Sequence, residues 1–157
     1  MNPTYERFLY WCIFHTEKAF SRSAVYERSK HRRDYLKSAI QKGFRKKVLF
    51  YNGTPVGMIE YAPSKVSGLP ITGANVIVMN CIWVHRRAAG HHLSKQLVAH
   101  MKKDEKGAAG FATLGCEDGP HRVYVRKDDM EKPGFKSTTS TSKCITAEFP
   151  DRRISRI

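Results

Sequence analysis

The stretch NCIWV (residues 80–84), followed by HRRAAGHHLS (residues 85–94), carries the most information about the fold. Its first part closes a run rich in Val and Ile that begins at residue 75, which is typical of a buried strand. A short basic loop with one glycine comes next, and Leu93, Leu97 and Met101 then recur at helical spacing. The sequence therefore predicts a strand over 75–84 and a helix over 93–103, joined by a tight basic loop.

The junction between this strand and this helix suits a phosphate group. The first backbone N–H groups of a helix have no partner within the helix, and the helix dipole makes that end positive. Arg86 and Arg87 add positive charge, and Gly90 removes a side chain where a ligand could approach the backbone. Neither a P-loop (GxxxxGK followed by Ser or Thr) nor a GxGxxG pattern occurs in the chain, which argues against the common nucleotide-binding loops.

The segments on either side predict an α/β (α+β) fold with a mixed sheet. Strands over 47–51 and 54–62 flank Asn52-Gly53, the strongest short signal for a hairpin. The remaining predicted elements are a basic helix over 31–42 ending at Gly43, a strand over 110–116, a helix over 123–132 stopped by Pro133-Gly134, and strands over 135–140 and 143–149. Residues 4–26 have helical spacing, although the apolar run 8–14 also fits a buried strand.

Length and composition predict one globular domain over residues 1–150, with a basic tail over 151–157. The 28 basic and 14 acidic residues give a net charge of +14, and nine of the basic residues lie between Arg28 and Lys47. That run is either a solvated helix face or a surface for nucleic acid or another polyanion. No apolar run is long enough to span a membrane, and the four cysteines form no CxxC pair. We therefore expect a cytoplasmic protein.

Two motifs in this chain resemble the GNAT superfamily of acetyltransferases, over roughly residues 40–150. In that family a long strand ends in Val and is followed by a loop of the form R-G-x-G-x-G/A and by a helix that carries a Leu-Leu pair. With Gly90 on the first glycine, Ser94 falls on the last small position, and Leu97 and Val98 fall on the pair. The segment MEKPGF (residues 130–135) resembles the Y-E-K-x-G-F that ends the family's last helix.

The chain departs from the family pattern at several positions, one of them Val123 where an Asn is usual. Ala89 stands where the family usually has Arg or Gln, and His92 stands where it has a second glycine. Met130 replaces the frequent Tyr, which is the usual proton donor to the leaving thiolate. The resemblance still implies a GNAT-like mixed, mostly antiparallel central sheet with flanking helices.

The resemblance implies an N-acetyltransferase that moves an acetyl group from acetyl-CoA to an amine by direct attack. The acceptor would be an amine-bearing small molecule or a protein. Backbone groups of the strand would hold the pantetheine arm and polarise the thioester. The implied cofactor-binding residues are Ile82, Trp83, Val84, Arg86, Arg87, Gly90, His91, His92, Leu93 and Ser94.

Three residues are candidates for the catalytic chemistry. Glu60 is the only carboxylate of the region from the hairpin to the long strand, so it is the candidate general base, or else an outward-facing strand acid. Tyr124 is the candidate acid in place of the missing Tyr, or else a packing aromatic. Cys116 ends the strand after the helix and is either catalytic or a small core residue. No metal is expected, because His91-His92 lack HExxH or Cys/His spacing. The alternative function is a basic nucleic-acid-binding module without catalysis.

Overall fold

The computed structural model describes residues 23–116, 125–141 and 144–149, and the seven strands among them form one mixed sheet. Seven strands are ordered β1-β2-β3-β4-β7-β6, with β5 paired to β4 off this path. The strands are β1 (Arg45–Tyr51), β2 (Thr54–Pro63), β3 (Val76–Val84), β4 (Gly110–Cys116), β5 (Val125–Arg126), β6 (Lys136–Thr141) and β7 (Cys144–Phe149). Only the β3–β4 and β4–β5 pairs are parallel among those described. The predicted mixed, mostly antiparallel sheet is therefore confirmed.

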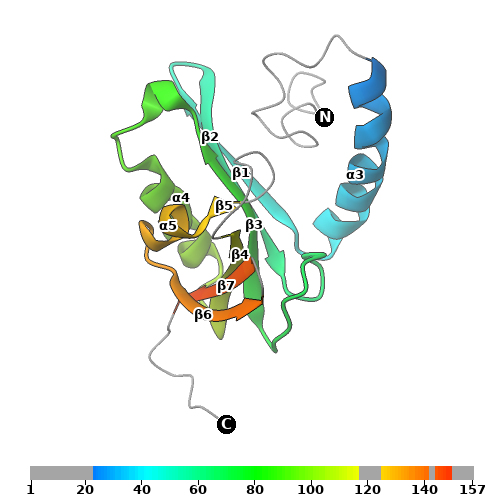
Figure 1. Cartoon of the computed structure of the whole chain (residues 1–157). Helices are drawn as coiled ribbons and strands as arrows, with labels where there is room; N and C mark the ends of the chain where they lie inside the picture. The colour runs from blue at the N-terminus through cyan, green and yellow to red at the C-terminus, as the bar shows by residue number, and fades with distance from the viewer. Residues whose placement is uncertain (1–22, 117–124, 142–143, 150–157) are drawn as a thin grey trace.

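Helices lie on both sides of the sheet (Figure 1). They are α3 (Ser23–Gln41), α4 (Leu93–Asp104) and α5 (Lys127–Glu131), with a short 3-10 helix η1 (Arg86–Ala88) before α4. Met101 of α4 and Met130 of α5 are buried with Ile59 of β2 in the main core cluster. Leu36 and Ala39 of α3 form a second buried cluster with Ala62 of β2. Ile59 and Ala62 are three residues apart on β2, so their side chains lie on opposite faces of the sheet. The two clusters therefore place α3 opposite α4 and α5.

Glycine and asparagine set the ends of two predicted elements. Asn52 and Gly53 both have positive φ, at 46° and 72°, as the tight hairpin turn between β1 and β2 requires. At the end of α3, Gly43 has a φ of 103°, and the backbone N–H of Phe44 donates to the carbonyl of Ala39 at 2.9 Å. This is the glycine-stopped helix end that the sequence predicts. Both predictions are confirmed.

Two predicted elements differ from the structure. The basic helix expected over 31–42 begins eight residues earlier, at Ser23. The helix expected over 123–132 is shorter than predicted and is limited to α5. Val125 and Arg126 instead form the short strand β5, which pairs with Gly115 and Cys116. Arg126 has an extended backbone (φ −68°, ψ 146°), and Asp128 and Asp129 lie in the first turn of the helix after it. Carboxylates are favoured at that end by the helix dipole. The other strands predicted from residue 47 onward agree with the structure to within one or two residues. The segment 1–22 and the tail 151–157 lie outside the described residues.

Candidate active site

Strands β3 and β4 separate partway along their length. They pair from Val76 opposite Gly110 to Met79 opposite Thr113, and beyond Met79 the strand β3 continues to Val84 without a partner on that side among the described strands. Asn80 lies at the point of separation. Asn80 has no partner residue on β2, because the consecutive residues Glu60 and Tyr61 of β2 pair with Cys81 and Met79 of β3. Such a bulge bends its strand, and on the side toward β4 the described strands leave the backbone edge along residues 80–84 open.

The loop after β3 is held at its beginning, around His85, and leads into the start of α4. The backbone N–H of His85 donates to the Val56 carbonyl at 2.8 Å, and Nδ1 of His85 accepts from the Arg87 N–H at 3.0 Å. Gly90 and His92 both have positive φ, at 88° and 53°, which turns the chain sharply into the helix. The side chain of His92 makes no capping hydrogen bond. The N–H groups of the first turn of α4 can therefore be donated to a ligand.

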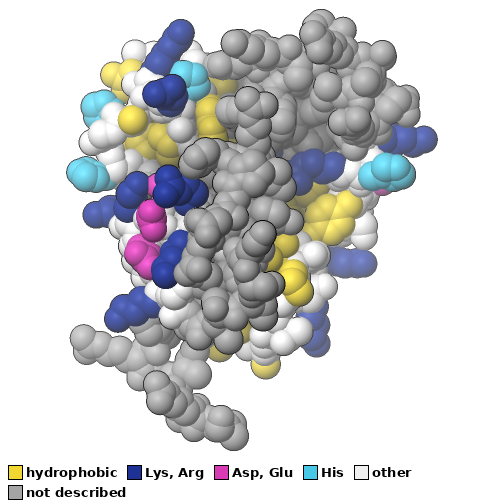
Figure 2. Space-filling model, viewed as in Figure 1, with side chains coloured by type: hydrophobic (Ala, Val, Ile, Leu, Met, Phe, Trp, Pro, Cys, Tyr) yellow, Lys and Arg dark blue, Asp and Glu magenta, His cyan; other side chains and the backbone are white. Residues whose placement is uncertain are grey.

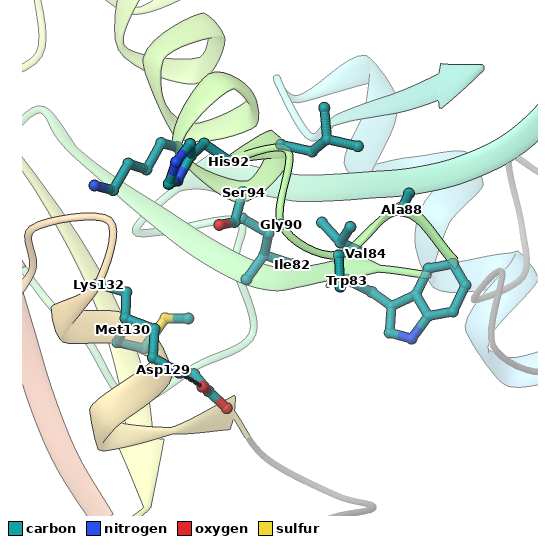
Figure 3. A pocket seen from close by; sticks show the side chains of 13 residues that line it. Ile82, Trp83, Val84, Ala88, Gly90, His92, Ser94, Asp129, Met130 and Lys132 are labelled. Carbon is teal, nitrogen blue, oxygen red and sulfur yellow. Dashed lines mark hydrogen bonds and ion pairs between the residues drawn. The ribbon is translucent and has the colours of Figure 1, made fainter. Parts of the chain in front are cut away.

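A cavity of about 660 Å³ lies between the end of β3, this loop and α5. In Figure 3, His92 and Ser94 stand on one side of it, with Asp129 and Met130 on the other and Ile82 between them. We call this cavity the cleft. It is lined by Ile82, Trp83, Val84, Ala88, Ala89, Gly90, His92, Leu93, Ser94, Lys95, Asp129, Met130 and Lys132.

The cleft carries little side-chain charge. Lys132 is paired with Asp129 at 2.7 Å on the α5 side. Lys95 lies in the first turn of α4, next to the free N–H groups of that helix. A cation at that position adds to the positive end of the helix dipole, so this end of the cleft attracts anions.

The structure brings together seven of the ten residues predicted to bind a cofactor. Those that line the cleft are Ile82, Trp83, Val84, Gly90, His92, Leu93 and Ser94. Arg87 and His91 line a neighbouring cavity instead, and Arg86 lines neither of these two cavities. Their roles stay predictions. Lys95 is not among the predicted site residues, although its place as the third residue of a helix after a glycine-containing loop is a usable signal.

The candidate base Glu60 is buried, with 2% of its side chain exposed, and lies on the face of β2 toward α3. Both of its oxygens accept from the guanidinium of Arg32 at 2.7 Å, and Lys46 lies 2.9 Å away. Burial alone would raise the pKa of Glu60. The charges of Lys46 and Arg32 and their hydrogen bonds outweigh burial and hold the pKa below its ordinary value. Glu60 is thus a paired carboxylate.

Of the other two catalytic candidates, one lies within the described residues. The backbone of Cys116 ends β4, on the far side of the separation from β3, and pairs with Arg126 and Cys144. Tyr124 lies outside the described residues. Met130 lies in the wall of the cleft with 2% of its surface exposed, and a thioether has no proton to donate.

Part of the basic run Arg28–Lys47 is paired with acids of the fold. Three of its cations contact acids within the fold: Arg32 and Lys46 contact Glu60, and Lys47 contacts Asp104. Lys30 and Lys37 are exposed on α3. A polyanion site on this run stays a prediction.

The described residues provide neither a cluster of metal ligands nor a helix suited to span a membrane. No group of three or more His, Cys, Asp or Glu side chains lies close enough to hold a metal ion. None of the helices in the part of the chain that the structure describes is both long and apolar enough to cross a membrane.

Solved structures share this fold at low sequence identity. The PaiA N-acetyltransferase of Thermoplasma acidophilum, crystallised with coenzyme A, has a TM-score of 0.58 at 14% identity, over 91% of this chain and 84% of that one. An acetyltransferase from Thermus thermophilus has a TM-score of 0.57 at 14% identity, over 76% and 73%. The ribosomal-protein-alanine N-acetyltransferase of Brucella melitensis has a TM-score of 0.54 at 14% identity, over 76% of both chains.

The amino-acid sequence itself identifies the family. No curated protein sequence matches the chain significantly. The sequence model of the acetyltransferase (GNAT) family, however, matches residues 9–126, which is well over half of the chain. The match includes β1 to β4, the loop and α4, and so most of the cleft. The chain therefore belongs to the acetyltransferase (GNAT) family.

Proposed function

We propose that the protein transfers an acetyl group from acetyl-CoA to an amine acceptor. The observation that carries this proposal is the separation of β3 from β4 beside the first turn of α4. It combines an open strand edge, where an amide-containing arm can bind as an added strand would, with a helix end that suits a pyrophosphate. A structure with a similar fold was crystallised with coenzyme A, which supports the choice of ligand.

The residues of the cleft fit such a ligand. The backbone of Ile82 and Val84 would bind the pantetheine arm, and the first N–H groups of α4 would bind the pyrophosphate, with Lys95 beside them. At Gly90 an added Cβ would meet no atom within 4 Å, so the space above this backbone is open to a ligand. The cleft volume of about 660 Å³ is within the usual range for such sites.

Acetyl-CoA supplies a thioester, and attack by the acceptor nitrogen forms the amide as the C–S bond breaks and the thiol leaves. The chain must then accept the amine proton and supply one to the thiolate. Glu60 has a lowered pKa and two cationic partners, which makes it a weak base at neutral pH. We therefore propose that Glu60 anchors α3. Tyr124 remains the proposed acid, and Cys116 the further catalytic candidate.

The acceptor we propose is an amine on a small molecule or a protein that is not itself a polycation. The net charge of +14 repels polycationic acceptors and favours neutral or acidic ones. Screening by salt should therefore change the rate with acidic acceptors more than the rate with neutral ones.

Ligand-induced stabilisation tests the proposed function. A ligand that binds only the folded protein adds about 2.7 kcal/mol at a hundredfold excess over its Kd. Acetyl-CoA should therefore raise the melting temperature, and thiol release should depend on an added amine. Retention on a coenzyme A resin but not on heparin at moderate salt would separate this function from nucleic-acid binding without catalysis. An unchanged melting temperature in millimolar acetyl-CoA would rule the proposal out.

A further inference from the structure

A second cavity, of about 690 Å³, lies between the turn of the β1–β2 hairpin and the loop before α4. We call it the hairpin pocket. It is distinct from the cleft but touches it, because Ala88 and Leu93 line both. The separated part of β3 contributes no residue to it, although Arg87 and His91, which the sequence predicts to bind the cofactor, line it.

The hairpin pocket combines aromatic surface with positive charge. Phe50 and Tyr51 contribute to its wall, and they are two of the three large hydrophobic side chains that are exposed in the described part of the chain, at 42% and 69%. Arg87 and His91 line the opposite side, on the loop. Figure 2 shows hydrophobic side chains flanked by basic and histidine side chains over the hairpin end and this loop, in its upper left. The residues described as lining the pocket include no Asp or Glu.

Two amides complete the set of polar groups. Asn52 lies at the hairpin turn and Gln96 on the first turns of α4, and both line the pocket. An amide side chain donates and accepts at once, which matches the edge of a heterocyclic base. Aromatic side chains stack on such a base, and Arg binds a phosphate through its planar fork. A simple fatty or aliphatic ligand would use none of these polar groups.

We propose that the hairpin pocket binds a nucleotide, with the base against Phe50 and Tyr51 and the phosphate toward Arg87. The nucleotide is either free or part of a single strand of RNA. It binds while acetyl-CoA is in the cleft, and the two ligands contact opposite sides of the same loop. Because that loop is shared, each ligand changes the affinity of the other by the same factor.

Isothermal titration with AMP tests this site on the full chain. AMP should bind with and without saturating coenzyme A, whereas ribose 5-phosphate, which lacks the base, and adenosine, which lacks the phosphate, should bind at least tenfold more weakly. Competition between AMP and coenzyme A for one site would overturn the proposal, because the pocket would then hold the coenzyme's own nucleotide end. Absence of AMP binding at millimolar concentration would overturn it equally. Binding of coenzyme A itself is recorded in the same titrations, so failure here is distinguishable from failure of the acetyltransferase proposal.

Matched variants locate the binding. Tyr51→Ala should weaken AMP binding about tenfold through loss of stacking, and Tyr51→Phe should not. Arg87→Ala should weaken it similarly, while Arg86→Ala, the neighbouring exposed arginine outside the pocket, should leave it unchanged. Equal effects of both arginine variants would show general charge attraction and would refute the pocket. Hexaadenylate distinguishes the two sources: a higher affinity than that of AMP, with a steep salt dependence, identifies RNA, and an equal or lower affinity identifies the free nucleotide.

Discussion

One guanidinium nitrogen of Arg32 lies 2.7 Å from each carboxylate oxygen of Glu60, which ties α3 to β2 across 28 residues of sequence. Lys46 of the neighbouring strand contacts the same carboxylate at 2.9 Å, and only 2% of either side chain in that pair is exposed. A buried carboxylate and its two cations stabilise the fold only together, because removing one partner leaves an unpaired charge buried away from water. This relationship makes the position of α3 dependent on Glu60.

Replacing Glu60 with Gln should lower the free energy of unfolding by about 3–5 kcal/mol at pH 7, the usual cost of breaking a buried ion pair. Urea denaturation measures it. The control is Asp128→Asn, since the Arg126–Asp128 pair at 3.3 Å is exposed at both ends and should contribute less than about 1 kcal/mol. Similar small losses in both variants would show that the Glu60 set does not support the fold.

The carboxylate of Glu60 also determines how the free energy of unfolding depends on pH in the acidic range. The pKa of Glu60 is lower in the folded protein than its ordinary value of 4.5, so its contribution is complete above that value. Stability should fall as the pH drops below 4.5 toward the folded-state pKa, because the unfolded chain then binds the proton more readily. Unfolding free energies between pH 3 and 7 should therefore decline less steeply in Glu60→Gln than in the wild type. Parallel curves would contradict the lowered pKa.

The sequence predicts strands and turns well where local chemistry decides them. Asn52-Gly53 fixes the hairpin turn, and the Val- and Ile-rich run up to Val84 is long enough to be recognised alone. The separation of β3 from β4 depends on a bulge at Asn80, which no local pattern specifies. The pairing of Glu60 with Arg32 joins residues far apart in the sequence, so the sequence left Glu60 as an isolated acid. The strand at Val125 forms only because β4 offers an open edge there.

A further expectation concerns the base in acetyl transfer. With two cations on its carboxylate, Glu60 does not take the amine proton, so Glu60→Gln should leave the acid limb of the pH–rate profile of kcat/KM in place. The profile is measured by thiol release with any amine that supports turnover, at a temperature where the variant is folded. Loss of that limb, with at least a hundredfold drop in kcat, would assign Glu60 as the base after all.

Two glycines allow the role of the loop to be tested against a matched control. Gly90 and Gly53 both have positive φ, and at each an added Cβ would meet nothing within 4 Å. Gly90→Ala and Gly53→Ala should therefore each cost about 1–2 kcal/mol of stability from the left-handed backbone alone. Only Gly90 lines the cleft, so only Gly90→Ala should also reduce the stabilisation by acetyl-CoA in thermal melts. An equal ligand effect in both variants would place the coenzyme elsewhere.

Lys95 gives the most direct test of where the phosphates bind, because it is the cleft cation in the first turn of α4. A charge-assisted hydrogen bond is worth about 1.5–3 kcal/mol, so Lys95→Ala should raise the KM for acetyl-CoA about tenfold or more. The same variant should leave the KM for S-acetylpantetheine unchanged, since that donor has the thioester arm without phosphates. Lys103→Ala is the control, because Lys103 is exposed in the last turn of the same helix and outside the cleft. The effect of Lys95→Ala should also shrink as salt is raised from 50 to 500 mM, while that of Lys103→Ala stays near zero. If Lys95→Ala raised the KM for both donors alike, its role would lie in shaping the cleft, and the pyrophosphate would have to bind without it.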